Sequence, residues 1–550
     1  MKGRKIKFIV GVVAVLSLLA FTIPSDRYFD IAKSLDIFAT LVKEVNANYV
    51  DEIDPKKLID TGINGMLQQL DPYTDYIPKE SLEAFSIQTT GEYAGVGALV
   101  GQINHKTVVT NPYVGFPAYR AGIRVGDELI GVNGKDVQGK PTGESSALLK
   151  GTPQTEVEVE VKRYGESAPL KFKLIREKIK INNVTYQGLI DSGLGYIKLD
   201  EFTPGAGREV ADAVMKLKTE GATKIILDLR DNPGGSLYEA VNIVNIFIPK
   251  GKEVVSTRGK AVESNKVYKT LNNPVDLDIP LAILTSGGSA SASEIVAGSL
   301  QDYDRAVLVG QRTFGKGLVQ TTRQLAYDAQ LKITTAKYYI PSGRCIQALD
   351  YAHRHSDGSV TKFPDSLKRE FKTKIGRKVY DGAGLAPDIA VETEKLATAS
   401  IELIASGFVF EYATRYCGEH KAIPQSMKAF RLSDEEYEKF VTWVHGQSFA
   451  YTPELENKME SVIASAKNEK YYDQLQQPLT ELKNKIKQTR GNDMVRFKTE
   501  ISRVLEEEIA FHYQLAQGQT EVSVDRDSEI LAAKKLLRDQ DKYKQLLSQQ

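Results

Sequence analysis

Ser291 is the residue whose type and setting point most directly to chemistry. It ends the small-residue loop SGGSAS and precedes ASEIVAGSLQ, in which Ile295, Val296, Ser299 and Leu300 recur at helical spacing and predict a helix with one buried side. The free amides and the positive dipole end of a helix N-terminus favour negative charge. A serine at this place suits acyl transfer, because the same amides can stabilise the oxyanion of the intermediate.

A structural role is the alternative for this serine. Ser291 and Glu294 fit the S-x-x-E capping box, in which the hydroxyl satisfies an otherwise unpaired amide. The local pattern alone favours this capping role over catalysis.

A serine nucleophile needs a base, and the sequence offers a lysine more readily than a histidine. The six histidines are His105, His353, His355, His420, His445 and His512. His353 and His355 are the two outside the β-rich and C-terminal segments, and they lie in a polar loop without an obvious orienting acid. Lys316 lies between two glycines after the strand-like AVLVG. Such a lysine is ordinarily solvated, but burial would lower its pKa and make the neutral amine accessible. Gln320 could then orient the amine.

Composition limits the class of protein. The chain has 550 residues, enough for several domains, and its formal net charge of +1 gives no indication of nucleic-acid binding. A hydrophobic share of 41% with 26% charged residues is that of an ordinary globular protein. Cys345 and Cys417 match no metal motif, and we expect both to be packing residues. No metal site or cofactor is predicted.

The N-terminus predicts export. The basic leader MKGRKIK precedes an uncharged run from Phe8 to Ile23, which indicates a secretory signal sequence or a short membrane anchor. No A-x-A cleavage pattern occurs around Ala20 to Ser25, which favours retention of the segment as a membrane anchor. The apolar run is shorter than the ~20 residues that span a bilayer comfortably, which favours a signal sequence that is cleaved. Export is expected in either case, and a buried core helix is the less favoured alternative.

Helices are predicted between residues 27 and 90. An apolar stripe recurs at three- and four-residue spacing, and a second helix over Lys56–Leu70 ends at Asp71 and Pro72. Core packing explains such a stripe, although a helical arm of this sort can also pair two subunits in a homo-oligomer.

From Gly91 the sequence changes to short β-prone runs with glycine turns, such as ALVGQI, EVEVEVKR and PLKFKLI. In the loop GEYAGVGAL, the amides around Gly95, Val96, Gly97 and Ala98 can form a nest for a C-terminal carboxylate. The stretch GFPAYRAGIRVGDELIGVNGKDV then resembles the PDZ consensus, with the nest placed as in the PDZ domains of bacterial proteases. PDZ domains take an extended peptide on a sheet edge.

The next segment indicates an α/β core. The apolar run Ile225–Leu229 leads into an Asn-Pro-Gly-Gly turn and then a helix, as in a βαβ unit with a mostly parallel sheet. Strand patterns recur between helices at Leu281–Leu284, Ala306–Val309 and Leu331–Thr335. Ligands bind beyond the carboxyl ends of such strands, so the Gly234–Gly235 turn and the Ser291 loop are expected to face one cleft.

These blocks together resemble the C-terminal processing peptidases, the tail-specific, carboxy-terminal-processing serine proteases. The resemblance covers roughly residues 35 to 395 and includes LDPYTDYI, GEYAGVGA, LDLRDNPGG, GGSASASEIVAGSLQDYDRAVLVGQRTFGKGLVQ, YYIPSGRCIQ and GAGLAPDI. It implies a crotonase-like layered α/β protease core with an inserted β-rich PDZ domain. It also implies Ser291 as nucleophile, Lys316 as general base and Gln320 as its orienting partner. The oxyanion hole would combine the Ala292 N–H with a glycine amide of Gly234–Gly235.

The expected organisation has five parts: a signal sequence or membrane anchor (1–26), an N-terminal helical region (27–90), a PDZ domain (91–178), a serine protease core (179–395) and a mainly helical C-terminal region (396–550). The expected function is a serine endopeptidase of the periplasm or cell envelope, with inner-membrane anchoring left open, that acts on polypeptides captured by their free C-termini. Two alternative functions make different demands on the sequence. A non-catalytic PDZ scaffold should have lost the serine, lysine or glutamine, and none is lost. An acyl-binding crotonase-type enzyme needs a CoA-binding feature, which the sequence does not show.

Overall fold

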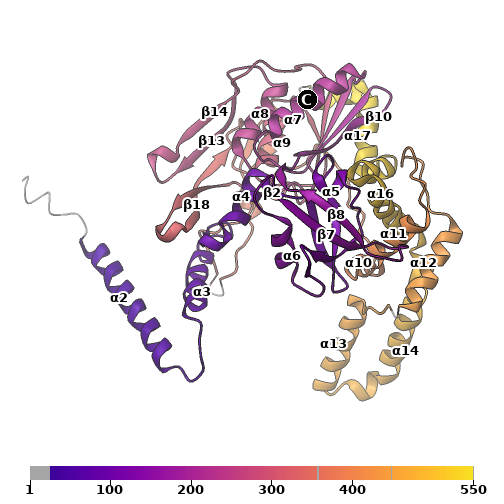
Figure 1. Ribbon diagram of the computed structural model, residues 1–550. Helices are drawn as coiled ribbons and strands as arrows, with labels where there is room; N and C mark the ends of the chain where they lie inside the picture. Colours follow the sequence, from indigo (N-terminus) through magenta and orange to yellow (C-terminus); the bar gives the residue numbers. More distant parts are fainter. Residues whose placement is uncertain (1–24, 356–357, 448, 549–550) are drawn as a thin grey trace, which may run out of the picture. The chain divides into compact units, whose positions relative to one another are not determined.

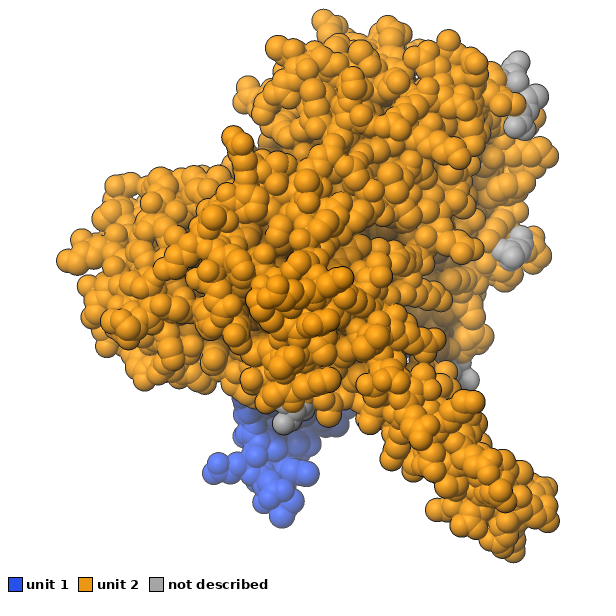
Figure 2. Space-filling view, turned by 90° about the vertical axis from the view of Figure 1, so that its right-hand side faces the viewer, with its two compact units in different colours: residues 1–79, 321–334 blue, residues 80–320, 335–550 orange. Residues whose placement is uncertain are grey.

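The computed structural model describes residues 25–355, 358–447 and 449–548. The predicted signal or anchor at 1–26 falls almost wholly outside this part of the chain. In the described part, no helix is both long and apolar enough to cross a bilayer. The chain divides into two compact units, one of residues 1–79 with 321–334 and one of residues 80–320 with 335–550 (Figure 2).

The first unit is a helical arm with a small β element. Helix α2 (Ser25–Asn48) precedes helix α3 (Pro55–Gln68), which begins where the Asp54 carboxylate accepts the Lys56 and Lys57 amides. Strand β1 (Asp75–Ile77) pairs antiparallel with the first residues of β18. The predicted helices are therefore present, and β1 interrupts the segment. Most apolar side chains of α2 are exposed, as Phe29 (69%) and Leu35 (62%) illustrate.

The second unit begins with a β-rich domain. The domain's main sheet has strand order β3-β4-β5-β7-β8, with β6 paired to β5, while β2 pairs with β9. Along β7, Val157, Val159 and Val161 are buried and alternate with more exposed glutamates, as the sequence pattern predicts. Strand β3 is at the edge of this sheet. The elements are α4 (Leu82–Thr90), β2 (Glu92–Gly95), β3 (Ala98–Ile103), β4 (Lys106–Pro112), α5 (Pro117–Arg120), β5 (Glu128–Val132), β6 (Lys135–Asp136), α6 (Thr142–Leu149), β7 (Glu156–Lys162), β8 (Leu170–Ile175) and β9 (Glu177–Lys180).

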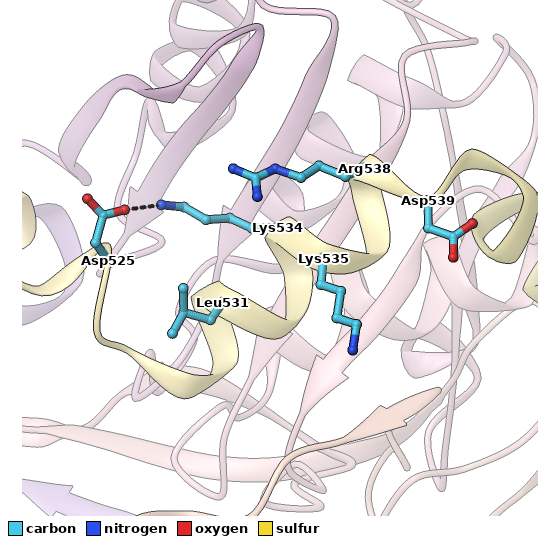
Figure 3. A pocket seen from close by; sticks show the side chains of 6 residues that line it. All are labelled: Asp525, Leu531, Lys534, Lys535, Arg538 and Asp539. Carbon is cyan, nitrogen blue, oxygen red and sulfur yellow. Dashed lines mark hydrogen bonds and ion pairs between the residues drawn. The ribbon is translucent and has the colours of Figure 1, made fainter.

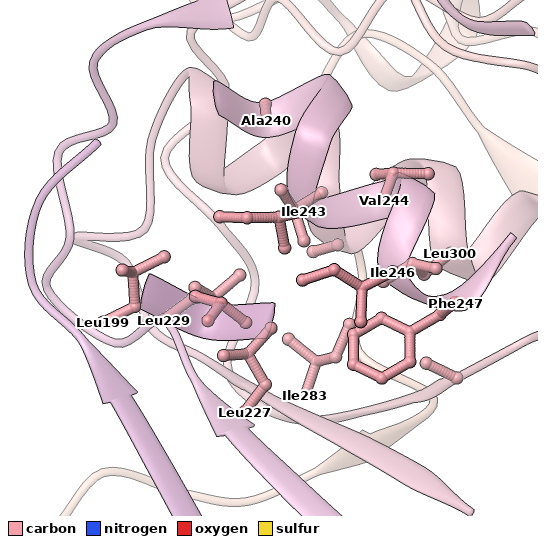
Figure 4. Packing of buried hydrophobic residues seen from close by; sticks show 14 of the residues in the cluster. Leu199, Leu227, Leu229, Ala240, Ile243, Val244, Ile246, Phe247, Ile283 and Leu300 are labelled. Carbon is pink, nitrogen blue, oxygen red and sulfur yellow. The ribbon is translucent and has the colours of Figure 1, made fainter. Parts of the chain in front are cut away.

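A six-stranded sheet forms the α/β core, in the order β10-β11-β12-β15-β16-β21. All neighbouring strands from β11 to β21 run parallel, and β10 is antiparallel to β11. Helices α7, α8 and α9 cover one face, where Leu227 and Leu229 pack against Ile243 and Phe247 (Figure 4). The elements are β10 (Val184–Asp191), β11 (Leu194–Leu199), α7 (Ala206–Thr219), β12 (Lys224–Asp228), α8 (Leu237–Phe247), β15 (Leu281–Thr285), α9 (Ala292–Asp302), β16 (Val307–Gly310) and β21 (Ile389–Ala390).

The opposite face of the same sheet is covered by the end of the chain. Helices α17 (Ser528–Arg538) and α18 (Gln540–Leu546) bury Ile530 and Leu537 against Ile226 and Leu284 (Figure 1). Because both faces are covered, the parallel strands are nearly continuous apolar runs.

Two sequence predictions were wrong in detail. The run Leu331–Thr335 is a strand, but it belongs to β18 (Gln330–Tyr339), which pairs antiparallel with β13 (Glu253–Gly259) rather than joining the parallel sheet. Helix α9 was expected to bury one side, but all of its residues are buried. The reason is its small residues: a Cβ placed on Gly298 would lie 2.8 Å from Ile340, so neighbouring segments approach closely on the side expected to face solvent. Strands β14 (Lys266–Lys269) and β17 (Leu318–Gln324) pair with β13 and β18 respectively.

The remaining C-terminal segment is helical, as predicted. An aromatic core that includes Tyr412, Tyr437 and Phe440 joins its helices. The long helix α16 is interrupted at Gln514 and Leu515, where the backbone leaves helical geometry. The elements after β18 are β19 (Glu370–Lys372), β20 (Lys378–Tyr380), α10 (Thr398–Ala405), α11 (Phe408–Glu419), α12 (Asp434–Gly446), α13 (Glu454–Asn468), α14 (Tyr472–Arg490), α15 (Asp493–Arg496) and α16 (Lys498–Ser523).

Candidate active site

The predicted catalytic residues follow neighbouring strands of the parallel sheet. The turn Arg230–Gly235 follows β12, the loop Ser286–Ser291 follows β15, and the loop Gln311–Lys316 follows β16. The carboxyl ends of parallel strands lie at one edge of a sheet, which is where α/β proteins bind their ligands. The fold therefore brings the three predicted loops to the same edge.

Ser291 occupies the N-cap of helix α9 in a strained backbone conformation, with φ 55° and ψ −112°. Such conformations cost about 1–3 kcal/mol and are concentrated at functional sites. The Asn232–Gly235 turn lies directly against this serine. A Cβ added at Gly234 would be 2.6 Å from the Ala290 carbonyl oxygen and 2.7 Å from the Ala292 nitrogen. Only glycine permits this approach of two backbones.

Glu294 joins the serine loop to the lysine loop. Its carboxylate is fully buried and accepts four hydrogen bonds. Oε2 accepts from the Ser291 and Lys316 amides, both at 2.9 Å, and Oε1 accepts from the Thr313 hydroxyl at 2.5 Å and the Gly315 amide at 2.8 Å. Burial raises the pKa of Glu294 to about 7, although these hydrogen bonds oppose the rise. The carboxylate of the predicted capping box is therefore also the link between the serine loop and the lysine loop.

Tyr338 forms a second link between the same residues. Its hydroxyl contacts the Lys316 carbonyl oxygen at 2.6 Å and the Ser291 carbonyl oxygen at 3.2 Å. The next amide, that of Gly317, donates to Gln347 Oε1 at 2.7 Å. The side chains of Ser291 and Lys316 are half-buried, as is Gln320 on β17. Tyr338 begins the block YYIPSGRCIQ of the resemblance, but no local pattern indicated its contacts with Ser291 and Lys316, because it lies in a different sheet.

The backbone amides distinguish the two glycines of the predicted oxyanion hole. The Gly234 amide donates to Asn232 Oδ1 at 2.9 Å and is therefore already used. Within the described residues, the Ala292 and Gly235 amides donate no hydrogen bond. Gly235 is exposed at φ 154°, with a close approach to the Phe202 carbonyl oxygen. These two amides are thus available as donors at this edge.

The predicted carboxylate nest lies between β2 and β3. The carbonyl oxygens of Val96 and Gly97 accept hydrogen bonds from Ala118 and Tyr113, which fixes the loop. The antiparallel bridge between Gly95 and Lys150 directs the Val96 amide towards the Leu149 carbonyl oxygen, whereas the Gly97 amide has no acceptor in the described part of the chain. Gly97 has φ 73°, and a Cβ there would lie 2.4 Å from that of Phe116. The nest is therefore formed by the backbone, and its Gly97 amide remains available.

His353 was expected to lack an orienting acid, and this was wrong. Asp350 Oδ2 lies 2.8 Å from His353 Nδ1, although the histidine side chain is 85% exposed. The aspartate three residues earlier was a signal available in the sequence. Both cysteines are free and half-buried. Among the described residues, no group of histidine, cysteine and carboxylate side chains could hold a metal ion.

A hollow of about 540 Å³ on helix α17 is lined by charged side chains (Figure 3). Lys534 donates to Asp525 at 2.5 Å, and Arg538 pairs with Asp191. None of the predicted site residues lines this hollow.

Comparisons with known proteins identify the family. Residues 193–352 match the family model for peptidase family S41, residues 108–163 that for a PDZ domain, residues 399–537 that for "Probable PDZ-protease, C-terminal helical domain", and residues 26–81 that for "Activating protease CtpB N-terminal domain".

Two curated relatives agree with these matches. A "Probable CtpA-like serine protease" of Staphylococcus aureus (strain COL) is 34% identical over 446 residues, which cover 78% of this chain and 84% of the relative. A "Carboxy-terminal-processing protease" of Bartonella bacilliformis is 36% identical over 353 residues, covering 63% of this chain and 81% of the relative. The photosystem II D1 C-terminal processing protease, a solved structure, is 27% identical and covers 66% of this chain and 94% of its own, with a TM-score of only 0.34. The chain therefore belongs to the carboxy-terminal-processing serine proteases of peptidase family S41, and it carries their PDZ domain.

Proposed function

We propose that this serine peptidase uses Ser291 as its nucleophile, Lys316 as its general base and Gln320 as the residue that orients the lysine amine. The observation that carries this proposal is the buried Glu294 carboxylate, which accepts the backbone amides of both Ser291 and Lys316 at 2.9 Å. A shared acceptor keeps the two residues at a fixed separation before substrate arrives, and such preorganisation lowers the barrier to reaction.

The proposed chemistry is acyl transfer. Lys316, in its neutral form, takes the Ser291 hydroxyl proton as Oγ attacks the peptide carbonyl carbon. The Ala292 and Gly235 amides stabilise the oxyanion, and the lysine ammonium then gives its proton to the leaving amine. Water attacks the resulting ester, losing a proton to Lys316, and collapse of the second intermediate returns the serine. Every proton moves between chain, substrate and water.

The PDZ domain would capture the C-terminal tail of the substrate. The unpaired amide of Gly97, in the turn between β2 and β3, suits a terminal carboxylate. Strand β3 continues from this loop and forms one edge of the sheet, with β4 as its partner on the other side. An extended tail can add to β3 as a further strand, with affinity from the backbone that tolerates varied sequences.

We further propose export to the cell envelope, with substrates there, from the basic leader and apolar run at the N-terminus. The exposed apolar stripe of α2 supports pairing with a second copy of the chain through this arm. Light scattering of the full chain and of a variant with Leu35→Glu and Phe38→Glu would test pairing, because the charges should give a smaller particle.

The test of the catalytic assignment is cleavage of a disordered protein, with fragments mapped by mass spectrometry. Ser291→Ala and Lys316→Ala should each abolish cleavage and leave binding of a tail peptide unchanged. His353→Ala serves as the control, since the exposed His353 should be dispensable. Retained cleavage by either folded variant at Ser291 or Lys316 would refute the dyad, and an inactive wild type would favour a PDZ scaffold instead.

Tail capture has a separate test. Two peptides of the same sequence, one with a free C-terminal carboxylate and one amidated, differ only in the charge that the nest would bind. The amidated peptide should show a higher KM with little change in kcat, because its scissile bond meets the same catalytic residues. Equal KM values would refute capture through the carboxylate.

A further inference from the structure

The first turn of helix α17 reaches two of the three loops that carry the candidate active site. Glu529 lies in this turn, and its Oε2 accepts from Arg230 Nη1 at 2.6 Å. Its Oε1 accepts from Gln311 Nε2 at 2.9 Å. Arg230 begins the turn that leads to Gly235, and Gln311 begins the loop that leads to Lys316. One carboxylate from the C-terminal segment thus bridges the oxyanion turn and the lysine loop.

Arg230 is held from both sides. Its guanidinium contacts both carboxylate oxygens of Asp228, with Nη2 2.6 Å from Oδ2, and its Nη1 also donates to Asp527 Oδ2 at 2.7 Å. The Tyr196 hydroxyl donates to Asp228 at 2.5 Å. Asp527 caps helix α17 by accepting the Ile530 amide at 2.8 Å. The orientation of Arg230 is therefore determined jointly by the sheet and by the helix.

Little solvent reaches this cluster. The side chain of Arg230 is 16% exposed and that of Glu529 is 11% exposed. Burial opposes ionisation of Asp228, but Arg230 holds the pKa of Asp228 below its ordinary value. Bidentate and charge-assisted bonds in such surroundings are strong and directional. The cluster can therefore fix the position of the turn after β12 relative to helix α17.

The serine loop is hydrogen-bonded to the same turn, the one that Arg230 begins. Asp231, which follows Arg230, has φ 57°, and its amide donates to Ser286 Oγ at 2.9 Å. Ser286 Oγ in turn donates to Asp231 Oδ1 at 2.8 Å. Arg230, Glu529, Pro233 and Ser286 also line one hollow of about 870 Å³. A shift of Arg230 would thus reach the serine loop as well as the oxyanion turn.

We propose that Glu529, together with Asp527, is a positioning residue for proteolysis: it acts through Arg230 and Gln311 to hold the oxyanion turn and the lysine loop at their working separation. This role rests on the proposed function of these loops. The C-terminal helical segment is then part of the catalytic machinery, although neither carboxylate touches the substrate.

The test compares Glu529→Gln with two other variants in the full chain. The amide keeps the size of the side chain but cannot pair ionically with Arg230. Gln311→Ala removes only the link to the lysine loop and leaves the Arg230 cluster intact. Asp541→Asn is the control, because Asp541 is an exposed carboxylate of the neighbouring helix α18. The readouts are kcat and KM for a short peptide, with kcat expressed per active site titrated by a serine-directed phosphonate.

Glu529→Gln should lower kcat per active site by about tenfold to a hundredfold and change KM by less than about twofold, because small displacements of catalytic groups act on the transition state. Gln311→Ala should lower kcat in the same way but less, and Asp541→Asn should match the wild type. A role in folding alone would lower the number of titrated sites and leave kcat per site unchanged. Wild-type kcat per site in Glu529→Gln and Gln311→Ala would overturn the positioning role. Absence of cleavage by the wild type would refute the proposed function itself.

Discussion

Glu294→Gln is the substitution that tests the catalytic geometry most directly. The carboxylate is an acceptor at both oxygens, each with two donors directed at it. An amide of the same shape places an NH₂ group at one of these positions. If the NH₂ replaces Oε2, the Ser291 and Lys316 amides both lose their acceptor. If it replaces Oε1, the Thr313 hydroxyl can turn, but the Gly315 amide cannot.

At least one buried amide is therefore left unpaired, which costs about 1–3 kcal/mol. Glu294→Gln avoids a cost in folding free energy that the wild type bears, namely the ionisation of a buried carboxyl group. The pKa of Glu294 is about 7 in the folded protein against an ordinary value of 4.5 for a glutamate, so its ionisation costs roughly 3 kcal/mol of folding free energy. The folded state retains this proton between pH 4.5 and 7, whereas the unfolded chain loses it. Stability from this group therefore falls as pH rises through that window.

Two measurements follow for Glu294→Gln, with the exposed Glu263→Gln as control. Thermal midpoints at pH 5 and pH 8 should show that the advantage of wild type over Glu294→Gln shrinks as pH rises, while Glu263→Gln shows no such change. At pH 8 the kcat of Glu294→Gln should be at least about tenfold lower, since the serine and lysine loops lose their shared acceptor. Wild-type kcat, or a stability difference that grows with pH, would refute the reasoning.

Three further substitutions probe the neighbouring groups. Gly235→Ala should lower kcat by about a hundredfold with little effect on KM, because the new Cβ displaces an oxyanion donor; Gly221→Ala, also at positive φ but in open space, should have no such effect on peptide hydrolysis. Gly97→Ala should weaken binding of a tail peptide, measured by calorimetry, because its Cβ would lie 2.4 Å from that of Phe116; unchanged affinity would argue against the nest. Tyr338→Phe should lower kcat several-fold at constant KM by removing a 2.6 Å contact to the lysine loop, and equal kinetics would show that Glu294 alone suffices.

Periodicity predicted most helices and strands, because each depends on which side chains alternate along a short segment. It could not predict strand partners. Leu331–Thr335 has the pattern of a strand, but Leu331 and Lys332 pair antiparallel with β1, which lies far away in the sequence. The same limit applies to α9, whose apolar spacing describes one face, while Ile340 and Leu385 cover the Gly298 side.

In the candidate site, too, local patterns in the sequence predicted less than the folded chain shows. The local pattern favoured a capping role for Ser291 and a solvated Lys316, and only the resemblance to the C-terminal processing peptidases implied their catalytic roles, which stay predictions. The S-x-x-E pattern predicted only a local cap, whereas three of the four donors to Glu294 come from Thr313 to Lys316. A charge buried between two loops is a property of the folded chain, and no local pattern identifies it.

The C-terminal helices could have been placed from a physical requirement rather than a pattern. A parallel sheet must be covered on both faces, and α7, α8 and α9 cover one of them. The alternate side chains of the strands, including Ile226, Leu284 and Val307, are fully buried on the other face. Ile530 and Leu537 of α17 belong to that cluster, so the cover comes from the last part of the chain. The C-terminal segment, which lies beyond the sequence motifs quoted for the resemblance, therefore completes the α/β core. Its helix α17 begins at the edge where the oxyanion turn and the lysine loop lie, because a helix covering parallel strands must end near one end of them.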